Sequence, residues 1–167
     1  GPAGPAGPAA TTTISTSPVV GTFSFQPSGG TTQASVTVDL YSLDAGQSSS
    51  ASYVVGTGAG AGVGKSSFDP MVMTIPLGPA AIDLTQSVDS GSQIATGTVI
   101  LYAANSKTKV EEIDLSNVAV SSLTTSSDAS TSGPLVSVSL KYAAIKYVLP
   151  TGETAQWSQA TNTATFP

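Results

Sequence analysis

Apolar and polar residues alternate through most of the chain from Val19 onward. Phe23 and Phe25 flank a serine, and apolar side chains occupy every second position in residues 36–40 and 71–77. A period of two is expected of a strand that buries one face. The pattern predicts a mainly β protein.

Two later apolar runs change parity partway along. In residues 113–120 the apolar set moves from odd to even positions near residues 116–117, and in residues 136–149 it moves back at residues 143–144. A change of parity is what a β-bulge produces, and bulges bend strands around barrels. Both changes predict a curved sheet.

Residues 98–102 are apolar on both faces, unlike the alternating runs. A strand of this kind is expected to be covered on both sides. In so small a domain, two-sided burial indicates a partner.

One segment departs from the period of two. Ala81, Leu84 and Val88 recur at helical spacing, Pro79 stands near the start of the run and Gly91 near its end. These signals predict one short helix within residues 78–91, with a Leu84/Val88 stripe packed on the barrel.

Residues 56–67, GTGAGAGVGKSS, resemble a phosphate-binding loop at their Gly-Lys-Ser end. That motif requires glycine where Ala59 stands, and it requires a helix that begins at Lys65. Pro70 and the alternation that follows predict a strand instead. We interpret the segment as a long, flexible, glycine-rich hairpin connection, whose glycines are Gly56, Gly58, Gly60, Gly62 and Gly64.

Composition narrows the function. The 167 residues suit one domain, with a net charge of -5, a pI near 4.2, five Lys and no Arg, Cys or His. Without cysteine and histidine the chain lacks thiolates, imidazole bases and most transition-metal ligands, so we expect no catalytic residue, no cofactor and no metal. Its acidity argues against nucleic acid as a partner, and it has no apolar run long enough for membrane insertion.

The low charge and high Ser/Thr content are typical of secreted structural proteins, so we expect an extracellular location. The chain opens with three Gly-X-Y triplets at Gly1, Gly4 and Gly7. Glycine at every third position is what a collagen triple helix requires. Two interpretations stay open for this segment: a collagen-like stalk or extended arm, and a Pro-rich leader. We expect residues 1–18 to form an N-terminal arm and linker, and residues 19–167 to form the β-barrel domain.

Candidate chemistry is sparse. Glu112 and Asp114 share a face of one predicted strand, where they are expected to be solvated, with cation binding as the alternative. Lys107 and Lys109 lie near them. Trp157 and the tyrosines are expected in the core or at contacts between copies, with a sugar-binding platform as the alternative.

The order of these pieces resembles the haemolysin-coregulated protein (Hcp) family, the tube proteins of type VI secretion. Three segments carry the resemblance, which covers roughly residues 20–160. They are the strand with Glu111, Leu115, Val118, Val120, Ser121 and Ser122, the strand with Val138, Ser139, Leu140, Tyr142 and Ile145, and the tail with Trp157.

The resemblance implies a small β-barrel with one flanking helix, assembled into hexameric rings that stack into a tube. It also implies that the glycine-rich segment reaches the next ring, where Lys65 meets a neighbour's carboxylate. The chain departs from the family in its low charge and its collagen-like start.

Three function classes follow. The first is a non-enzymatic structural protein that self-assembles into rings, and these stack into an extracellular tube or filament. The alternative is the C-terminal trimerisation or adhesion head of a collagen-like surface stalk, which predicts threefold symmetry. A secreted hydrolase is a third and remote class, because the chain has no histidine to activate its serines.

Overall fold

The fold is mainly β, as the alternation predicts. The structure is a computed structural model that describes residues 19–27, 34–52, 62–127 and 133–167. Its strands and single described helix are β1 Gly21–Phe25, β2 Val36–Leu40, β3 Ser42–Asp44, β4 Gln47–Ser52, β5 Gly62–Phe68, β6 Met71–Pro76, α1 Pro79–Ser90, β7 Ile94–Tyr102, β8 Lys109–Ser126, β9 Leu135–Lys141, β10 Ala144–Val148 and β11 Thr154–Ser158.

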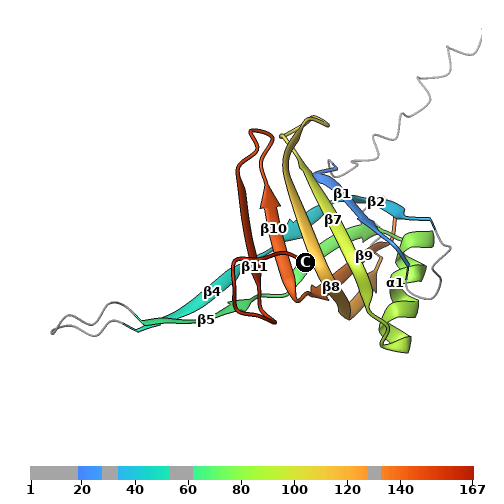
Figure 1. Ribbon diagram of the computed structural model, residues 1–167. Coiled ribbons are helices and arrows are strands. Elements are labelled where there is room, and N and C mark those ends of the chain that lie inside the picture. The colour runs from blue at the N-terminus through green and yellow to red at the C-terminus, as the bar shows by residue number, and fades with distance from the viewer. Residues whose placement is uncertain (1–18, 28–33, 53–61, 128–132) are drawn as a thin grey trace, which may run out of the picture.

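The large sheet closes on itself. Its strands are bonded in the order β2-β1-β7-β8-β9-β6-β3, so the two ends of the order are β2 and β3. These two strands follow each other directly in the chain and are separated only by Tyr41, whose amide donates to the carbonyl of Thr74 in β6 at 2.8 Å. One segment therefore pairs with β1 at its start and with β6 at its end. The predicted barrel is confirmed (Figure 1).

The two predicted parity changes lie opposite each other. β8 pairs first with β10, up to Ser116 against Ala144, and then with β9, from Ala119 against Lys141. The sum of partner numbers is the same on both sides of this junction, so neither strand carries an extra residue there. Asn117 instead takes a left-handed backbone conformation with φ 51°, which Asn tolerates better than most residues.

The parity changes are thus confirmed, but their form differs from the bulge predicted. Both strands bend at one level, and we call this level the matched kink, formed by residues 116–119 and 141–144. A register shift of the expected kind lies just beyond it, between Val120 and Ser122 of β8. Here Ser121 turns its hydroxyl to the carbonyl of Ser139 at 3.0 Å.

Apolar side chains of β1, β2, β6, β7, β8, β9 and β10 meet in one core. The rings of Phe23 and Phe25 stack at 5.3 Å, and Gly97 of β7 leaves the space that Phe23 fills. The largest fully buried side chains are Phe23, Leu40, Met71, Met73, Ile75, Leu84, Ile94, Leu115, Leu140, Ile145, Val99 and Val118.

Helix α1 lies where predicted and joins the same core. Ala80, Ala81 and Leu84 are buried with the barrel side chains. The stripe differs from the predicted one at its end, because Ser87 is 2% exposed while Val88 is only half-buried. Gly91 ends the helix with φ 68°, the left-handed conformation that favours glycine, and its amide donates to Val88.

The predicted two-sided burial of residues 98–102 does not occur within one chain. Val99 is buried, but Ile100 and Tyr102 on the outer face are half-buried. Ile100 lies between Thr22 of β1 and Glu112 of β8 on that face. Any full cover over these side chains would have to come from outside the described chain.

Strands β4 and β5 form a separate hairpin that projects from the barrel (Figure 1). We call this hairpin the arm. Gly62, Gly64 and Lys65, predicted in a flexible connection, lie in β5, so that part of the expectation is wrong. Lys65 starts no helix, as predicted. Gly56, Gly58 and Gly60 lie outside the described residues, as do Gly1, Gly4 and Gly7. Among the described residues, no helix is long and apolar enough to cross a bilayer.

Gly21 offers a test of the barrel. A Cβ atom at this position would overlap the backbone carbonyl of Ile100 in the neighbouring strand. We expect Gly21→Ala to lower the free energy of unfolding by about 1–3 kcal/mol, because β1 must shift away from β7. Urea titration followed by the fluorescence of Trp157, the single tryptophan, measures the change.

Gly78→Ala is the control, since no atom beyond the adjacent residues of the chain lies within 4 Å of the added methyl group. An equal loss for both variants would contradict the close approach of β1 and β7.

Candidate functional site at the root of the arm

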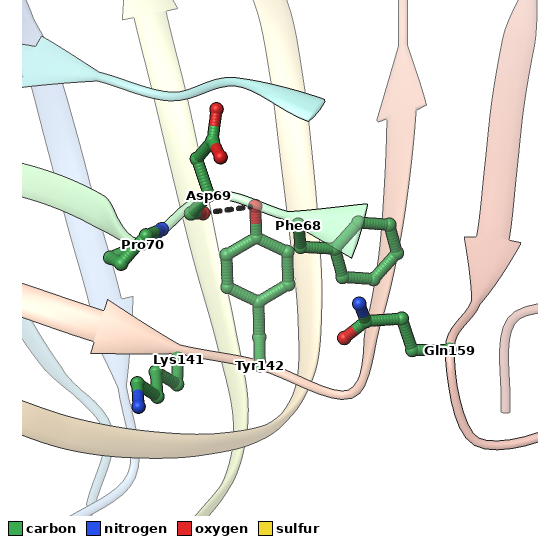
Figure 2. Close-up of a pocket in the computed structure, with 6 residues that line it drawn as sticks. All are labelled: Phe68, Asp69, Pro70, Lys141, Tyr142 and Gln159. Atoms are coloured by element: carbon green, nitrogen blue, oxygen red, sulfur yellow. Dashed lines mark hydrogen bonds between the residues drawn. The ribbon is translucent and has the colours of Figure 1, made fainter. Parts of the chain in front are cut away.

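The arm is joined to the barrel through an aromatic pair. Phe68, the last residue of β5, stacks on Tyr142 at 5.1 Å between ring centroids, with 21° between the planes. The Tyr142 hydroxyl donates to the backbone carbonyl of Asp69 at 3.2 Å (Figure 2). Tyr142 is itself buried and lies in the matched kink. The arm thus begins on a side chain of the barrel core.

Further hydrogen bonds fix the other strand of the arm. The amide of Asp69 donates to the carbonyl of Gly46 at 3.0 Å, which closes the arm at its base. Gln47, the first residue of β4, donates from Nε2 to the hydroxyl of Tyr147 in β10 at 3.1 Å. Both strands of the arm are therefore attached to the barrel at one side, which fixes the direction in which the arm leaves it.

A cavity of about 410 Å³ opens beside this junction. It is lined by Phe68, Asp69, Pro70, Lys141, Tyr142 and Gln159, and we call it the arm-root cavity (Figure 2). Gln159 is held by its backbone N–H, which donates to the carbonyl of Ala143 in the matched kink at 2.8 Å. Lys141 is exposed at the end of β9. The cavity combines an aromatic wall with one cation.

Burial governs the ionisation of Tyr142. It raises the pKa of the phenol to about 12, with smaller contributions from Tyr147 and Asp69. The hydroxyl therefore stays protonated, and able to donate to Asp69, throughout the neutral pH range.

The paired carboxylates predicted at Glu112 and Asp114 lie on the outer face of β8. Lys109 forms an ion pair with Glu112 at 2.9 Å, and its hydrogen bond lowers the pKa of that carboxyl. Burial raises the pKa of Asp114, and the charge of Glu112 raises it further, although Lys146 faces it from β10. The pair is partly neutralised by lysine, and the described residues hold no cluster of three potential metal ligands.

A second cavity, of about 320 Å³, lies at the far end of β10 and β11. Glu111, Tyr147, Leu149, Glu153, Thr154 and Ala155 line it, and we call it the acidic cavity. Burial raises the pKa of Tyr147, and the charge of Glu111 adds to this shift. No local pattern in the sequence connects Glu111 with Glu153.

Within the described part of the chain, Tyr142, Tyr147 and Trp157 form no exposed platform. Tyr142 is buried, Tyr147 packs against the core, and Trp157 is half-buried opposite Ile145. The Nε1 atom of Trp157 is buried without a hydrogen-bond partner among the described residues. Tyr53 lies outside them. The structural role predicted for Tyr142 and Tyr147 fits these positions.

Sequence reasoning located the arm but missed its root. Phe68 and Tyr142 lie far apart in the chain, and no local pattern connects them. Two local signals mark the place: Asp69-Pro70 directly follows a strand, and Tyr142 directly precedes the second parity change.

Comparison with known proteins gives both a family and a fold. The family model for "Type VI secretion system effector, Hcp" matches residues 28–148. A solved structure of a type six secretion system protein is 16% identical, with a TM-score of 0.69 over 86% of this chain and 98% of that one. Hcp1 from Salmonella typhimurium is 15% identical, with a TM-score of 0.67 over 89% of this chain and 100% of the other.

A more distant likeness is to a chain of the six-fold symmetrised anti-feeding prophage baseplate. It is 11% identical, with a TM-score of 0.53 over 78% of this chain and 93% of that one. At such identities the structures show a shared fold. No curated protein sequence matches the chain.

Tyr142 gives a prediction in pH. Because its folded pKa is raised to about 12 from the ordinary tyrosine value of 10.0, its contribution to stability is full below pH 10 and is lost as pH rises toward 12. We expect Tyr142→Phe to reduce this alkaline loss, since phenylalanine keeps the stack on Phe68 and cannot ionise. Urea titrations at several pH values from 8 to 12 measure it.

Tyr41→Phe is the matched control, because Tyr41 is not part of the arm root. If both variants flatten the alkaline loss equally, Tyr142 is not the group responsible.

Proposed function

Because the chain belongs to the Hcp family of type VI secretion proteins, we propose that its copies form rings of six that stack into a tube. The family is one of structural tube proteins and not of enzymes, and the resemblance drawn from the sequence is confirmed. The observation that carries the proposal is the family match, which spans residues 28–148 and with them the barrel strands from β2 to β10.

The arm is proposed as the element that connects one ring to the next. It is anchored at its base by the Phe68–Tyr142 stack and by Gln47, so it is held in position before a neighbour arrives. A preorganised element loses little conformational entropy on binding. Gly56, Gly58, Gly60, Gly62, Gly64 and Lys65 are proposed as its assembly residues.

Apolar side chains on the outer surface support association. Ile100 and Tyr102 on β7 are half-buried, and Leu77 and Ile82 beside and on α1 are exposed. Contacts between copies gain free energy by removing such side chains from water. We therefore propose that the partner of the chain is a second copy of itself. From its negative charge we expect no nucleic-acid partner, and from its hydropathy we expect no membrane insertion.

The location proposed for the assembled tube is outside the cell, in keeping with a secretion family and a surface of low charge. Residues 1–18 are proposed as a separate N-terminal arm and linker, and residues 19–167 as the barrel domain. The three Gly-X-Y triplets keep one alternative open, a head domain that trimerises on a collagen-like stalk. Particle mass distinguishes three copies from six.

Removal of the arm tests the proposal. Ser49 and Ser66 are register partners in the hairpin, so residues 50–65 can be replaced by the two-residue turn Asn-Gly. We expect the variant to keep rings of the wild-type mass and to lose stacks, because the barrel is intact and the connecting element is absent. Native mass spectrometry gives the ring mass, and negative-stain electron microscopy gives the stacks.

A deletion of residues 1–17 is the matched control and is expected to stack normally. Wild-type protein that stays monomeric at high concentration would refute the ring. Stacks formed without residues 50–65 would refute the role of the arm alone.

A further inference from the structure

The two ends of the barrel differ in kind. The arm projects from one side of the barrel, and α1 lies on the other side (Figure 1). When identical subunits stack in one direction, each contact joins two unlike faces, which is a heterologous contact. A stack whose axis runs along the arm brings the arm side of one copy to the α1 side of another.

Helix α1 presents an apolar and acidic surface. Ile82 is 53% exposed on the helix, and Leu77, directly before it, is 47% exposed. Asp89 is exposed seven positions after Ile82, which is two turns along the same helix face. The helix carries the carboxylates of Asp83 and Asp89 and no cation. We call Ile82, Gln86 and Asp89 the outer face of α1.

The arm-root cavity has the complementary character. Phe68 and Tyr142 offer an aromatic wall, and Lys141 at the rim has no ion-pair partner among the described residues. The cavity also contains the carboxylate of Asp69. In Figure 2 that carboxylate lies on the opposite side of the Tyr142 ring from Lys141. A carboxylate that approaches from the Lys141 side of the ring therefore meets this cation before it meets the Asp69 carboxylate.

We propose that the outer face of α1 in one copy docks on the arm-root cavity of a second copy. Ile82 packs against the Phe68–Tyr142 pair, and Asp89 pairs with Lys141. The inference rests on the proposed function, since it names the surface that receives the next ring. It also places the receiving cavity directly beside the arm, so the arm and α1 contact neighbouring parts of the stack.

The acidic cavity is a poorer site for the same helix. Glu111 and Glu153 line it without a cation among its lining residues, so Asp83 and Asp89 would approach two like charges. Like charges brought together at an interface reduce affinity and exclude wrong partners. Charge therefore selects the arm-root cavity over the acidic one.

Charge reversal tests the contact. We expect Lys141→Glu and Asp89→Lys each to reduce the stacked fraction by about tenfold or more, because a small penalty is repeated at every subunit of a ring. The double variant restores the opposite-charge pair and is expected to recover stacking. Negative-stain electron microscopy measures stacking, and native mass spectrometry reports the rings in the same samples.

Lys107→Glu is the matched control, since Lys107 lies at the β7–β8 turn away from the arm root, and it should stack normally. If the single variants stack like wild type, or if the double variant stacks no better than either single one, the contact is refuted. Intact rings in that case leave the ring itself standing, whereas monomers refute both.

Cysteine pairing locates the contact independently. The chain has no cysteine, so Asp89→Cys with Lys141→Cys introduces the two thiols without background. Under oxidation we expect a ladder of covalent oligomers, because each copy links to the next through one thiol of each kind. Non-reducing gel electrophoresis measures the ladder.

The matched pair Asp89→Cys with Lys107→Cys should give no ladder, and single-cysteine variants should give dimers at most. A ladder of equal yield from the matched pair, or none from the first pair, would overturn the proposed docking.

Discussion

The barrel depends on strands that change partner without ending. The segment from Val36 to Asp44 pairs with β1 and then with β6, and β8 pairs with β10 and then with β9. Each backbone group of a closed sheet must keep a hydrogen bond through such a change, because an unpaired buried amide or carbonyl is costly. The changes are met by local bends at Tyr41 and at Asn117, and the left-handed conformation of Asn117 supplies the second of them.

The same bend determines where the arm leaves the barrel. Tyr142 lies in the matched kink, with its ring in the core cluster, its face against Phe68 and its hydroxyl on Asp69. A change in barrel packing would therefore move the base of the arm. This coupling explains how a hairpin attached at one end can present its strands in a defined direction, which a free glycine-rich loop could not do.

Much of the fold follows from local pattern. The alternation, the helix between Pro79 and Gly91 and the two parity changes are all visible in sequence, since burial of one face imposes a period on neighbouring residues. That the parity changes oppose each other is not visible, because it depends on the register between β8 and β9–β10. The Phe68–Tyr142 stack escapes for the same reason. The buried stripe of α1 contains Ser87 where the sequence predicts Val88, because these neighbouring residues lie on either side of the same helix face.

The sequence also misjudged Lys65 and its glycines in part. Glycine favours turns by its backbone freedom, so Gly62 and Gly64 indicated a flexible connection. In the structure, pairing with β4 places them in a strand, up to Gly62 against Ser52. Cross-strand hydrogen bonds outweigh a modest local preference once a partner strand is present.

The sparse charge of the chain suits repeated contacts better than single ones. An exposed ion pair contributes about 0–1 kcal/mol, too little to hold two copies together alone. Between two rings the same contact is repeated around the circumference, and after the first contact forms the others are effectively intramolecular. Single copies therefore bind each other weakly through one such contact, whereas two rings join through many copies of it. Because those few charges are placed beside apolar side chains such as Ile82 and Phe68, they select the partner face while burial supplies most of the free energy.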